Sequence, residues 1–278
     1  MKPKRPLNDK ERYILERKGT EAPYSGEYWN HFDQGIYTCR KCGSPLYRSE
    51  DKFSSDCGWP SFDAEIPGAV KRETDVDGYR TEILCSSCEG HLGHVFTGEQ
   101  LTDKNTRHCV NSLSMKFHKT RQAIFASGCF WGTQYHMDKA AGVLLTTVGY
   151  TGGSTSEPTY EEVCTGSTGH LEAIEVLYDP EHTDFETLAR LFFETHDPSQ
   201  KDGQGPDIGS QYLSAIFYHN KREKETAEQL IAYLKRKKIL AATKLLPAGI
   251  FWPAEPYHQH YYEKKNSSPY CHFYTKRF

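Results

Sequence analysis

Two pairs of cysteines, each with two residues between its members, constrain this sequence more than any other feature. Cys39 and Cys42 form the first pair, and Cys85 and Cys88 form the second. Four thiolates in two CxxC pairs are the ligand set of a closed, tetrahedral structural Zn²⁺ site, which leaves no open position for catalysis. The 42 residues between the pairs exceed the spacing of a common zinc ribbon. We therefore expect two separate hairpins that one zinc ion holds together.

Length and charge restrict the class of protein. The 278 residues are enough for about two domains. The 34 Lys and Arg residues against 37 Asp and Glu residues lack the basic excess that nucleic-acid binding requires. The basic start has no apolar run typical of a signal peptide, and no apolar stretch reaches the length of a membrane span. Nine cysteines would also suit a disulfide-rich secreted protein, but their odd number favours a reduced compartment. We expect a cytoplasmic protein with no nucleic-acid or membrane partner.

The pattern of secondary structure changes near residue 118, which predicts domains at 1–118 and 119–278. Residues 7–18 predict a helix in which Asn8 and Glu11 form a capping box and Gly19 is the stop. The following short runs are rich in aromatic and β-branched residues and are broken by Gly, Pro, Asp and Ser. They predict an antiparallel all-β domain with the CxxC pairs in its turns.

The second half predicts an α/β (α+β) two-layer domain with a mixed sheet. Its first elements are a strand at 122–127, a helix at 131–142 and a strand at 143–150, in the order of a strand, helix, strand unit. The later elements are a strand at 170–178, an amphipathic helix at 183–195 with Thr183 and Glu186 as capping box, a strand at 212–219 and a helix at 221–240.

Cys129 lies in the sequence GCFWG, between a predicted strand and a predicted helix. Unpaired N–H groups and the helix dipole at such a position favour an anion, so we expect a lowered thiol pKa and a reactive cysteine. Phe130 and Trp131 fit either the wall of an apolar pocket or the hydrophobic core. Cys164 has no flanking signature and is expected to be a packed apolar thiol.

Arg107, Cys109 and Asn111 alternate along a predicted strand in RHCVNS, so their side chains share one face. An arginine stabilises a neighbouring thiolate, and an asparagine can donate a hydrogen bond to an oxygen; a solvated strand face is the alternative. His91 and His94 in GHLGH fit acid/base or structural roles equally well, because four thiolates already complete the metal site.

Taken together, these motifs resemble the two types of methionine sulfoxide reductase, fused in the order B then A. Residues 31–117, with CRKCGSPLY, CGWPSF, CSSCEGHLGHVF and RHCVNSLSMKF, are similar to the B-type enzyme. Residues 123–274, with GCFWG, TYEEV, TGHLEAIEV, GPDIGSQY, YHQHYY and PYCH, are similar to the A-type enzyme. The resemblance implies reduction of the R sulfoxide by the first domain and of the S sulfoxide by the second, and so repair of both epimers of oxidised methionine.

For the second domain, the resemblance implies that Cys129 attacks the sulfoxide sulfur and that Glu172 protonates its oxygen. Cys271 would then condense with the oxidised Cys129 to a disulfide, which thioredoxin would reduce. The remaining residues that the resemblance assigns to the substrate site are Phe130, Trp131, Tyr160, Asp207 and Tyr212.

For the first domain, the resemblance implies Cys109 as nucleophile and Cys57 as resolving thiol. Trp59 would contact the methyl group of the substrate. The polar residues that would activate the thiolate and place or protonate the oxygen are His91, His94, Arg107 and Asn111. The sequence departs from the DxSHG stretch of many B-type enzymes, so Asp75 and Asp77 are expected to be turn residues only.

Two other classes of function fit parts of the sequence. A thiol peroxidase or acyltransferase would use Cys129 with a histidine, but it leaves Glu172 and the second nucleophile unexplained. A zinc-ribbon adaptor would use the CxxC pairs as a binding platform and GCFWG as core. Assays with sulfoxide substrates distinguish all three classes.

Overall fold

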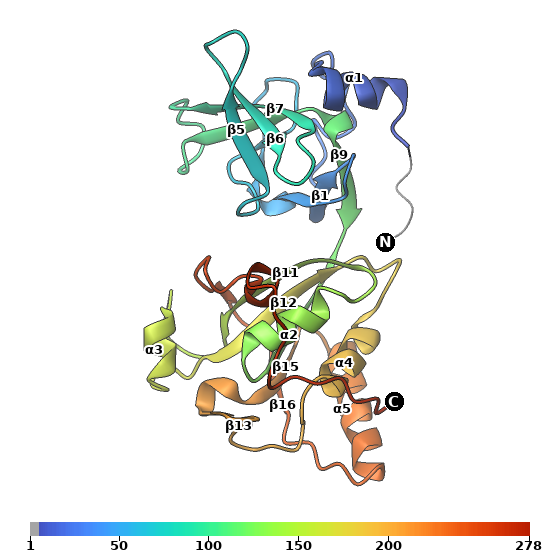
Figure 1. Cartoon of the computed structure of the whole chain (residues 1–278), viewed down its shortest axis with the longest axis vertical. Helices are drawn as coiled ribbons and strands as arrows, with labels where there is room; N and C mark the ends of the chain where they lie inside the picture. Colours follow the sequence, from blue (N-terminus) through green and yellow to red (C-terminus); the bar gives the residue numbers. More distant parts are fainter. Residues whose placement is uncertain (1–5) are drawn as a thin grey trace. The chain divides into compact units, whose positions relative to one another are not determined.

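The chain divides into two units that meet between Thr120 and Arg121 (Figure 1). The coordinates, a computed structural model, describe residues 6–278. The first unit consists of two antiparallel sheets and one N-terminal helix, and the second contains a mixed sheet with helices. This agrees with the predicted fold class of an all-β domain followed by an α/β domain. No helix among residues 6–278 is long and apolar enough to cross a membrane.

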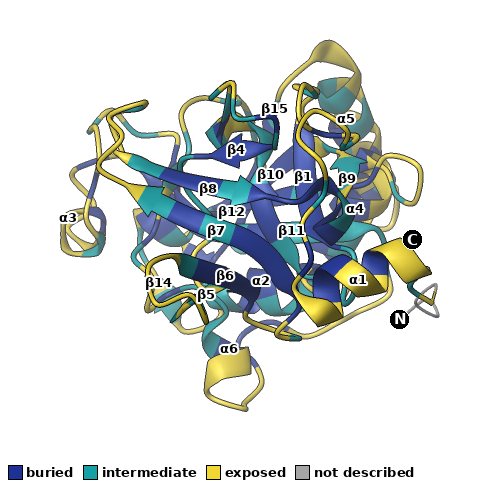
Figure 2. Ribbon diagram, turned by 90° about the horizontal axis from the view of Figure 1, so that it is seen from above, coloured by how far each residue is buried: buried dark blue, intermediate teal, exposed yellow. Residues whose placement is uncertain are grey.

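Helix α1 (Asp9–Arg17) opens the first unit with the predicted capping box. The side chain of Asn8 accepts the N–H of Glu11, and the carboxylate of Glu11 accepts the N–H of Asn8. The helix ends at Arg17, one residue before the predicted end at residue 18, because Lys18 itself takes the left-handed conformation at φ 56°. Figure 2 shows a buried side and an exposed side of α1, and Ile14 and Leu15 lie on the buried side.

The strands of the first unit form two sheets, and every pairing described in them is antiparallel. The first sheet has the order β2 (Pro45–Arg48), β1 (Gly35–Cys39) and β9 (Met115–Lys119). The second has the order β3 (Lys52–Phe53), β4 (Ser61–Phe62), β8 (Thr106–Val110), β7 (His91–Thr97), β6 (Thr81–Cys85) and β5 (Val70–Thr74). Two 3₁₀ turns, η1 (Ser49–Asp51) and η2 (Ser112–Ser114), connect strands.

Large aromatic side chains fill the core of the first unit. Phe62 of β4 stacks on Tyr47 of β2 with ring centroids 4.3 Å apart and meets Tyr37 of β1 edge-on at 5.1 Å. All three side chains are fully buried. Such ring pairs contribute about 0.5–1.5 kcal/mol each beyond their area burial, so they join the two sheets into one unit.

The sheet of the second unit places β12 (Leu171–Tyr178) between β10 (Arg121–Ser127) and β11 (Val143–Thr151). β12 is antiparallel to both, so β10 and β11 run parallel without pairing with each other. The predicted strand, helix, strand unit is present in the sequence as β10, α2 (Phe130–Met137) and β11. In the sheet, however, β12, which follows them in the sequence, lies between β10 and β11. The full order is β16 (Lys244–Pro247), β15 (Ser214–Tyr218), β10, β12, β11 and β17 (Trp252–Pro253), with β15 and β16 parallel.

Helices α4 (Phe185–Glu194) and α5 (Lys221–Arg236) pack on one face of this sheet. Phe192 of α4 stacks on Phe125 of β10 with ring centroids 5.2 Å apart. The predicted capping box at Thr183 is wrong, because Asp184 is the N-cap and accepts the N–H of Thr187. Both residue types are good caps, and only the backbone path selects between them.

Several predicted elements are longer than those observed. The helix predicted at 131–142 ends at Met137, the strand predicted at 212–219 is Ser214–Tyr218, and the helix predicted at 221–240 ends at Arg236. The short elements of the second unit are α3 (Tyr160–Cys164), β13 (Gly203–Gln204), β14 (Asp207–Ile208), η3 (Ser210–Tyr212) and α6 (Tyr261–Lys264).

Candidate active sites and metal centre

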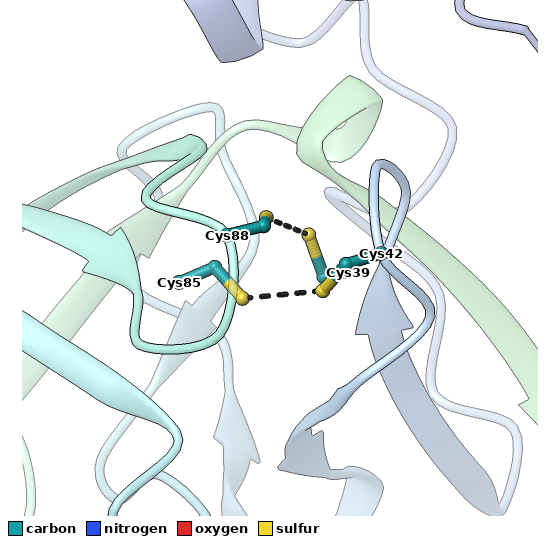
Figure 3. A group of neighbouring side chains, drawn as sticks. All are labelled: Cys39, Cys42, Cys85 and Cys88. Carbon is teal, nitrogen blue, oxygen red and sulfur yellow. Dashed lines mark hydrogen bonds between the residues drawn. The ribbon is translucent and has the colours of Figure 1, made fainter.

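The four CxxC cysteines meet at the ends of two hairpins, as expected. Cys39 and Cys85 end β1 and β6, and Cys42 and Cys88 lie in the turns that follow (Figure 3). All four sulfur atoms lie within 4.8 Å of one another, with Sγ–Sγ distances of 3.6 Å between Cys39 and Cys88 and 3.5 Å between Cys42 and Cys85. Four zinc–thiolate bonds of about 2.3 Å in a tetrahedron separate the sulfurs by roughly 3.8 Å. The cluster therefore fits a structural zinc ion.

Two further cysteines of the first unit face each other. The Sγ of Cys57, in the loop between β3 and β4, lies 3.9 Å from the Sγ of Cys109 on β8. Hydrogen bonding by Cys109, Ser55 and Ser61 lowers the pKa of Cys57 to about 4. The same contact with Cys57, together with burial, holds the pKa of Cys109 above its usual range, although the nearby Arg107 opposes this effect. In the resting pair the thiol pKa of Cys57 is therefore lowered and that of Cys109 raised, and the expected arginine effect on Cys109 is outweighed.

Strand pairing aligns polar side chains beside Cys109. His94 of β7 lies directly opposite Cys109, and Glu82 of β6 lies opposite His94, so the three share one face of the sheet. A ring nitrogen of His94 bonds the carboxylate of Asp75 at 2.7 Å, and a ring nitrogen of His91 bonds Glu82 at 2.6 Å. Burial lowers the pKa of His91 despite the Glu82 carboxylate. Two carboxylate–histidine pairs with ring centroids 5.6 Å apart thus adjoin the thiol.

The remaining candidates of the first unit are engaged with protein groups. Arg107 makes two hydrogen bonds, 2.7 and 2.8 Å long, to the carboxylate of Glu99. The buried amide of Asn111 donates to the carbonyl of Leu92, and its oxygen accepts a backbone N–H from the N-terminal segment. The indole N–H of Trp59 donates to a carbonyl of that same segment.

Cys129 and Glu172 form the centre of the candidate site in the second unit. Cys129 is the N-cap of α2, and the N–H of the next residue, Phe130, donates to the Glu172 carboxylate at 3.2 Å. Only 2% of Glu172 is exposed, and burial raises the pKa of this carboxyl to about 8 despite that hydrogen bond. The site therefore holds a carboxyl that is mostly protonated at neutral pH.

The predicted lowering of the Cys129 pKa is wrong for this resting state. Burial, and then the charge of Glu172, raise the pKa of the thiol well above its usual range. A backbone N–H, that of Trp131, acts in the predicted direction, but desolvation of a side chain that is only 6% exposed outweighs it. The helix position was predicted correctly, but the depth of the site could not be read from the sequence.

The two aromatic residues after Cys129 differ in their surroundings. Phe130 is 1% exposed and packs in a buried cluster with Tyr150 and Val148, as a core residue does. Trp131 is partly exposed, stacks on Tyr261 at 3.8 Å and donates its indole N–H to a ring nitrogen of His258. Of the two aromatic side chains, Trp131 is therefore the more accessible one.

Cys271, Asp207 and Tyr212 complete the candidate site of the second unit. Burial and the charge of Asp207 raise the pKa of the Cys271 thiol to about 12. The charge of Asp207 also contributes to the raised pKa values of Glu172 and Cys129. The hydroxyl of Tyr270 donates a hydrogen bond to the Asp207 carboxylate. Burial and Glu172 raise the pKa of Tyr212 to about 12. Asp207 and Glu172 therefore act electrostatically on the same cysteines.

Cys164 was expected to be a packed apolar thiol, and this is wrong. It is exposed at the last residue of α3. The short helix starts at Tyr160, and a hydrogen bond with Tyr160 partly opposes the burial that raises the pKa of the Cys164 thiol.

The two units match two families in the order of the observed sites. Residues 121–278 match the peptide methionine sulfoxide reductase family, and residues 7–119 match the SelR domain. The chain belongs to the peptide methionine sulfoxide reductase family. It is an oxidoreductase with a B-type domain N-terminal to an A-type domain, and the two types differ in the sulfoxide epimer that they reduce.

Individual relatives match the A-type domain. The peptide methionine sulfoxide reductase MsrA of Thermus thermophilus is 49% identical over 154 residues, which are 54% of this chain and 86% of that protein. MsrA of Acinetobacter baumannii is 45% identical over 153 residues, or 55% of this chain and 88% of that protein. The crystal structure of Mxr1 from Saccharomyces cerevisiae in reduced form, 33% identical, covers 56% of this chain and 92% of that chain with a TM-score of 0.51.

Some residues of the two sites were not predicted from the sequence. Asp75 was expected to be a turn residue, but its carboxylate binds His94 as well as Arg80. Glu255 of the A-type domain accepts the hydroxyl of Tyr150 and the N–H of Tyr160, which holds the start of α3 against the site. No local pattern marks either carboxylate, because each contact depends on how separate segments meet.

Proposed function

We propose that the A-type domain reduces the S epimer of methionine sulfoxide with Cys129 as nucleophile and Glu172 as acid. The thiol sulfur attacks the sulfoxide sulfur, the oxygen passes to Cys129 as a sulfenic acid, and methionine leaves. Glu172 supplies the proton that the sulfoxide oxygen requires. The observation that carries this proposal is the buried Glu172 carboxyl beside Cys129, whose raised pKa of about 8 keeps it protonated at neutral pH.

Aromatic and hydroxyl groups of the A-type domain would orient the substrate. Trp131 and Phe130 would hold the methyl group, because they provide the apolar surface next to Cys129. Tyr160 and Tyr212, whose hydroxyls stay protonated because burial raises their pKa values, would donate hydrogen bonds to the sulfoxide oxygen. Asp207 would position this region through its contact with Tyr270.

The B-type domain would reduce the R epimer with Cys109 as nucleophile. When Cys109 attacks, a proton or negative charge shifts between the sulfurs of Cys57 and Cys109, because the two thiols are in contact. His94, opposite Cys109, and the neighbouring His91 would move protons to the oxygen. Trp59 would contact the methyl group, and Arg107 and Asn111 would bind or place polar atoms of the substrate.

A second thiol would complete each catalytic cycle. Cys57 condenses with the Cys109 sulfenic acid, and Cys271 condenses with that of Cys129, each step forming a disulfide and releasing water. Thioredoxin would reduce both disulfides by thiol–disulfide exchange and become oxidised itself. The Sγ–Sγ distance of 3.9 Å between Cys57 and Cys109 supports this assignment in the B-type domain.

The substrates would be methionine sulfoxide in oxidised proteins and free methionine sulfoxide, so the enzyme would repair oxidative damage. It would act in the cytoplasm. Zinc bound by Cys39, Cys42, Cys85 and Cys88 would hold the two hairpins of the B-type domain together and take no part in the reaction. No organic cofactor is required, because the cysteines carry the electrons.

The experiment is thioredoxin-coupled reduction of each pure sulfoxide epimer by single-cysteine variants of the full chain. Cys129→Ser should abolish reduction of the S epimer and spare the R epimer, and Cys109→Ser should do the reverse. Cys164→Ser, which replaces an exposed thiol, is the matched control and should keep both activities.

The resolving thiols are tested by counting methionine in the same assay. Cys271→Ser and Cys57→Ser should each release about one methionine per site without thioredoxin and should then fail to recycle, since no intradomain disulfide forms. Continued reduction of the S epimer by Cys129→Ser, or recycling of a resolving variant at the parent rate, would show that the assigned cysteine is wrong.

A further inference from the structure

The N-terminal segment at residues 20–24, hereafter the arm, binds the loop that carries Cys57. The backbone N–H of Tyr24 donates to the carbonyl of Gly58 at 2.8 Å. The hydroxyl of Tyr24 donates to the carbonyl of Asp56 at 2.7 Å. The indole N–H of Trp59 donates to the carbonyl of Glu21 at 3.1 Å. Three hydrogen bonds thus fix the residues on both sides of Cys57.

The arm is also attached to the strand end that follows Cys109. The N–H of Glu21 donates to the side-chain oxygen of Asn111 at 3.0 Å, and the carboxylate of Glu21 accepts the N–H of Leu113 at 3.1 Å. These residues follow Cys109 by two and four positions. The arm therefore connects the segment of one redox cysteine with the segment of the other.

The loop needs such support, because its backbone is unusual. Asp56 and Gly58 both have positive φ angles, 55° and 90°. A Cβ atom on Gly58 would lie 2.7 Å from the Cβ of Pro23 and 3.0 Å from the nitrogen of Tyr24. The arm and the loop are thus in direct contact at the residue next to Cys57, and only glycine fits there.

We propose that the arm is a clamp that positions Cys57 for disulfide formation, with Tyr24 as a positioning residue for the second step of R-epimer reduction. This inference rests on the proposed role of Cys57. In that step Cys57 displaces hydroxide from the Cys109 sulfenic acid, a sulfur–sulfur bond of about 2.05 Å forms and water leaves. The sulfurs begin 3.9 Å apart. A loop held near this separation condenses faster than one that samples many positions.

The first step has no such dependence on the Tyr24 hydroxyl, because Cys109 alone attacks the sulfoxide. Loss of the hydroxyl removes one hydrogen bond of the loop, and a net value of about 0.5–1.5 kcal/mol corresponds to roughly a 2- to 10-fold change. Tyr24→Phe should therefore release methionine from the R epimer at the parent rate and form the Cys57–Cys109 disulfide about 2- to 10-fold more slowly.

The test is a single turnover of the full chain with the R epimer and no thioredoxin. Quenched samples are analysed for released methionine, for the disulfide, and for sulfenic acid trapped by dimedone on Cys109. Tyr13→Phe, an exposed tyrosine on α1 outside the arm, is the matched control and should behave as the parent. Gly58→Ala, which presses the arm away from the loop, should slow the disulfide step more than Tyr24→Phe does.

Each result has a defined meaning. An unchanged or faster disulfide step in both Tyr24→Phe and Gly58→Ala would overturn the clamp, as would an equal slowing of methionine release and disulfide formation in Tyr24→Phe. Cys57→Ser serves as the reference for the proposed role of Cys57, because it should trap the sulfenic acid permanently. If Cys57→Ser still recycles, the role of Cys57 fails irrespective of Tyr24. Methionine release from the R epimer at the parent rate in the first turnover reports that the B-type domain of a variant remains folded.

Discussion

Replacing Glu172 by glutamine should slow sulfoxide reduction at the A-type site but speed alkylation of Cys129. At pH 7 a carboxyl with a pKa of about 8 is about 90% protonated, whereas a glutamate with the ordinary value of 4.5 is only about 0.3% protonated. Burial of Glu172 thus raises the fraction of the acid form by roughly 300-fold. Glutamine has the same shape but no acidic proton, and loss of a positioned general acid costs about 10²–10⁴ in rate. We expect Glu172→Gln to slow reduction of the S epimer by that factor at neutral pH.

The same substitution should make Cys129 more reactive towards a reagent that needs no acid. The charge of Glu172 raises the pKa of the Cys129 thiol, and this charge forms as the pH rises through about 8. At pH 9 the parent carries the charge and Glu172→Gln does not, so alkylation of Cys129 by iodoacetamide should be faster in the variant. At pH 6 the carboxyl is protonated in the parent, so the two proteins should react at similar rates.

The assay measures S-epimer reduction by methionine release and alkylation by mass spectrometry of the peptide that contains Cys129. Glu175→Gln is the matched control, because Glu175 is a buried glutamate of the same strand whose side chain points to the opposite face and binds Gln122. Reduction by Glu172→Gln within a factor of two of the parent would refute the acid role. Slower alkylation of Cys129 at pH 9 would refute the electrostatic coupling.

Two further predictions concern the B-type domain. Cys85→Ser should lose the metal and unfold the B-type domain, since a structural zinc contributes roughly 10 kcal/mol to folding, while S-epimer reduction by the A-type domain persists. Metal analysis and circular dichroism measure the loss of metal and of folded structure. An unchanged metal content would contradict the prediction. Asp75→Asn should slow R-epimer reduction by roughly tenfold, because His94 loses its charged partner. Asp77→Asn, a substitution in the same turn, should leave the rate unchanged. Equal rates of R-epimer reduction in the two variants would show that Asp75 is not part of the site.

The strands of the B-type domain were predictable because their local composition and their environment agree. GIYTC is rich in β-branched and aromatic residues, as expected of such a strand, and it forms β1. The start of α4 was less predictable, because Thr183 and Asp184 are adjacent and both are good N-caps. The split order of β10, β12 and β11 has no local signature, since it depends on pairings between strands about 50 residues apart.

For the sites, the sequence identified groups that carry chemistry but not the environment that adjusts them. The position of Cys129 at a helix start was predictable, whereas its raised pKa depends on burial and on Glu172, 43 residues further along the chain. The contact of Asp75 with His94 likewise results from the packing of separate segments. Motifs therefore predicted the residue types, and tertiary structure decided their protonation and partners.

The connection between the two domains consists of a single residue. β9 ends at Lys119 and β10 begins at Arg121, and both strands are hydrogen-bonded within their own sheets. A protease needs an extended stretch of unpaired backbone, and Thr120 alone does not offer one.

Oxidants that approach an exposed methionine without chiral guidance produce both configurations at sulfur in similar amounts. One chain that carries both domains supplies one A-type site for every B-type site.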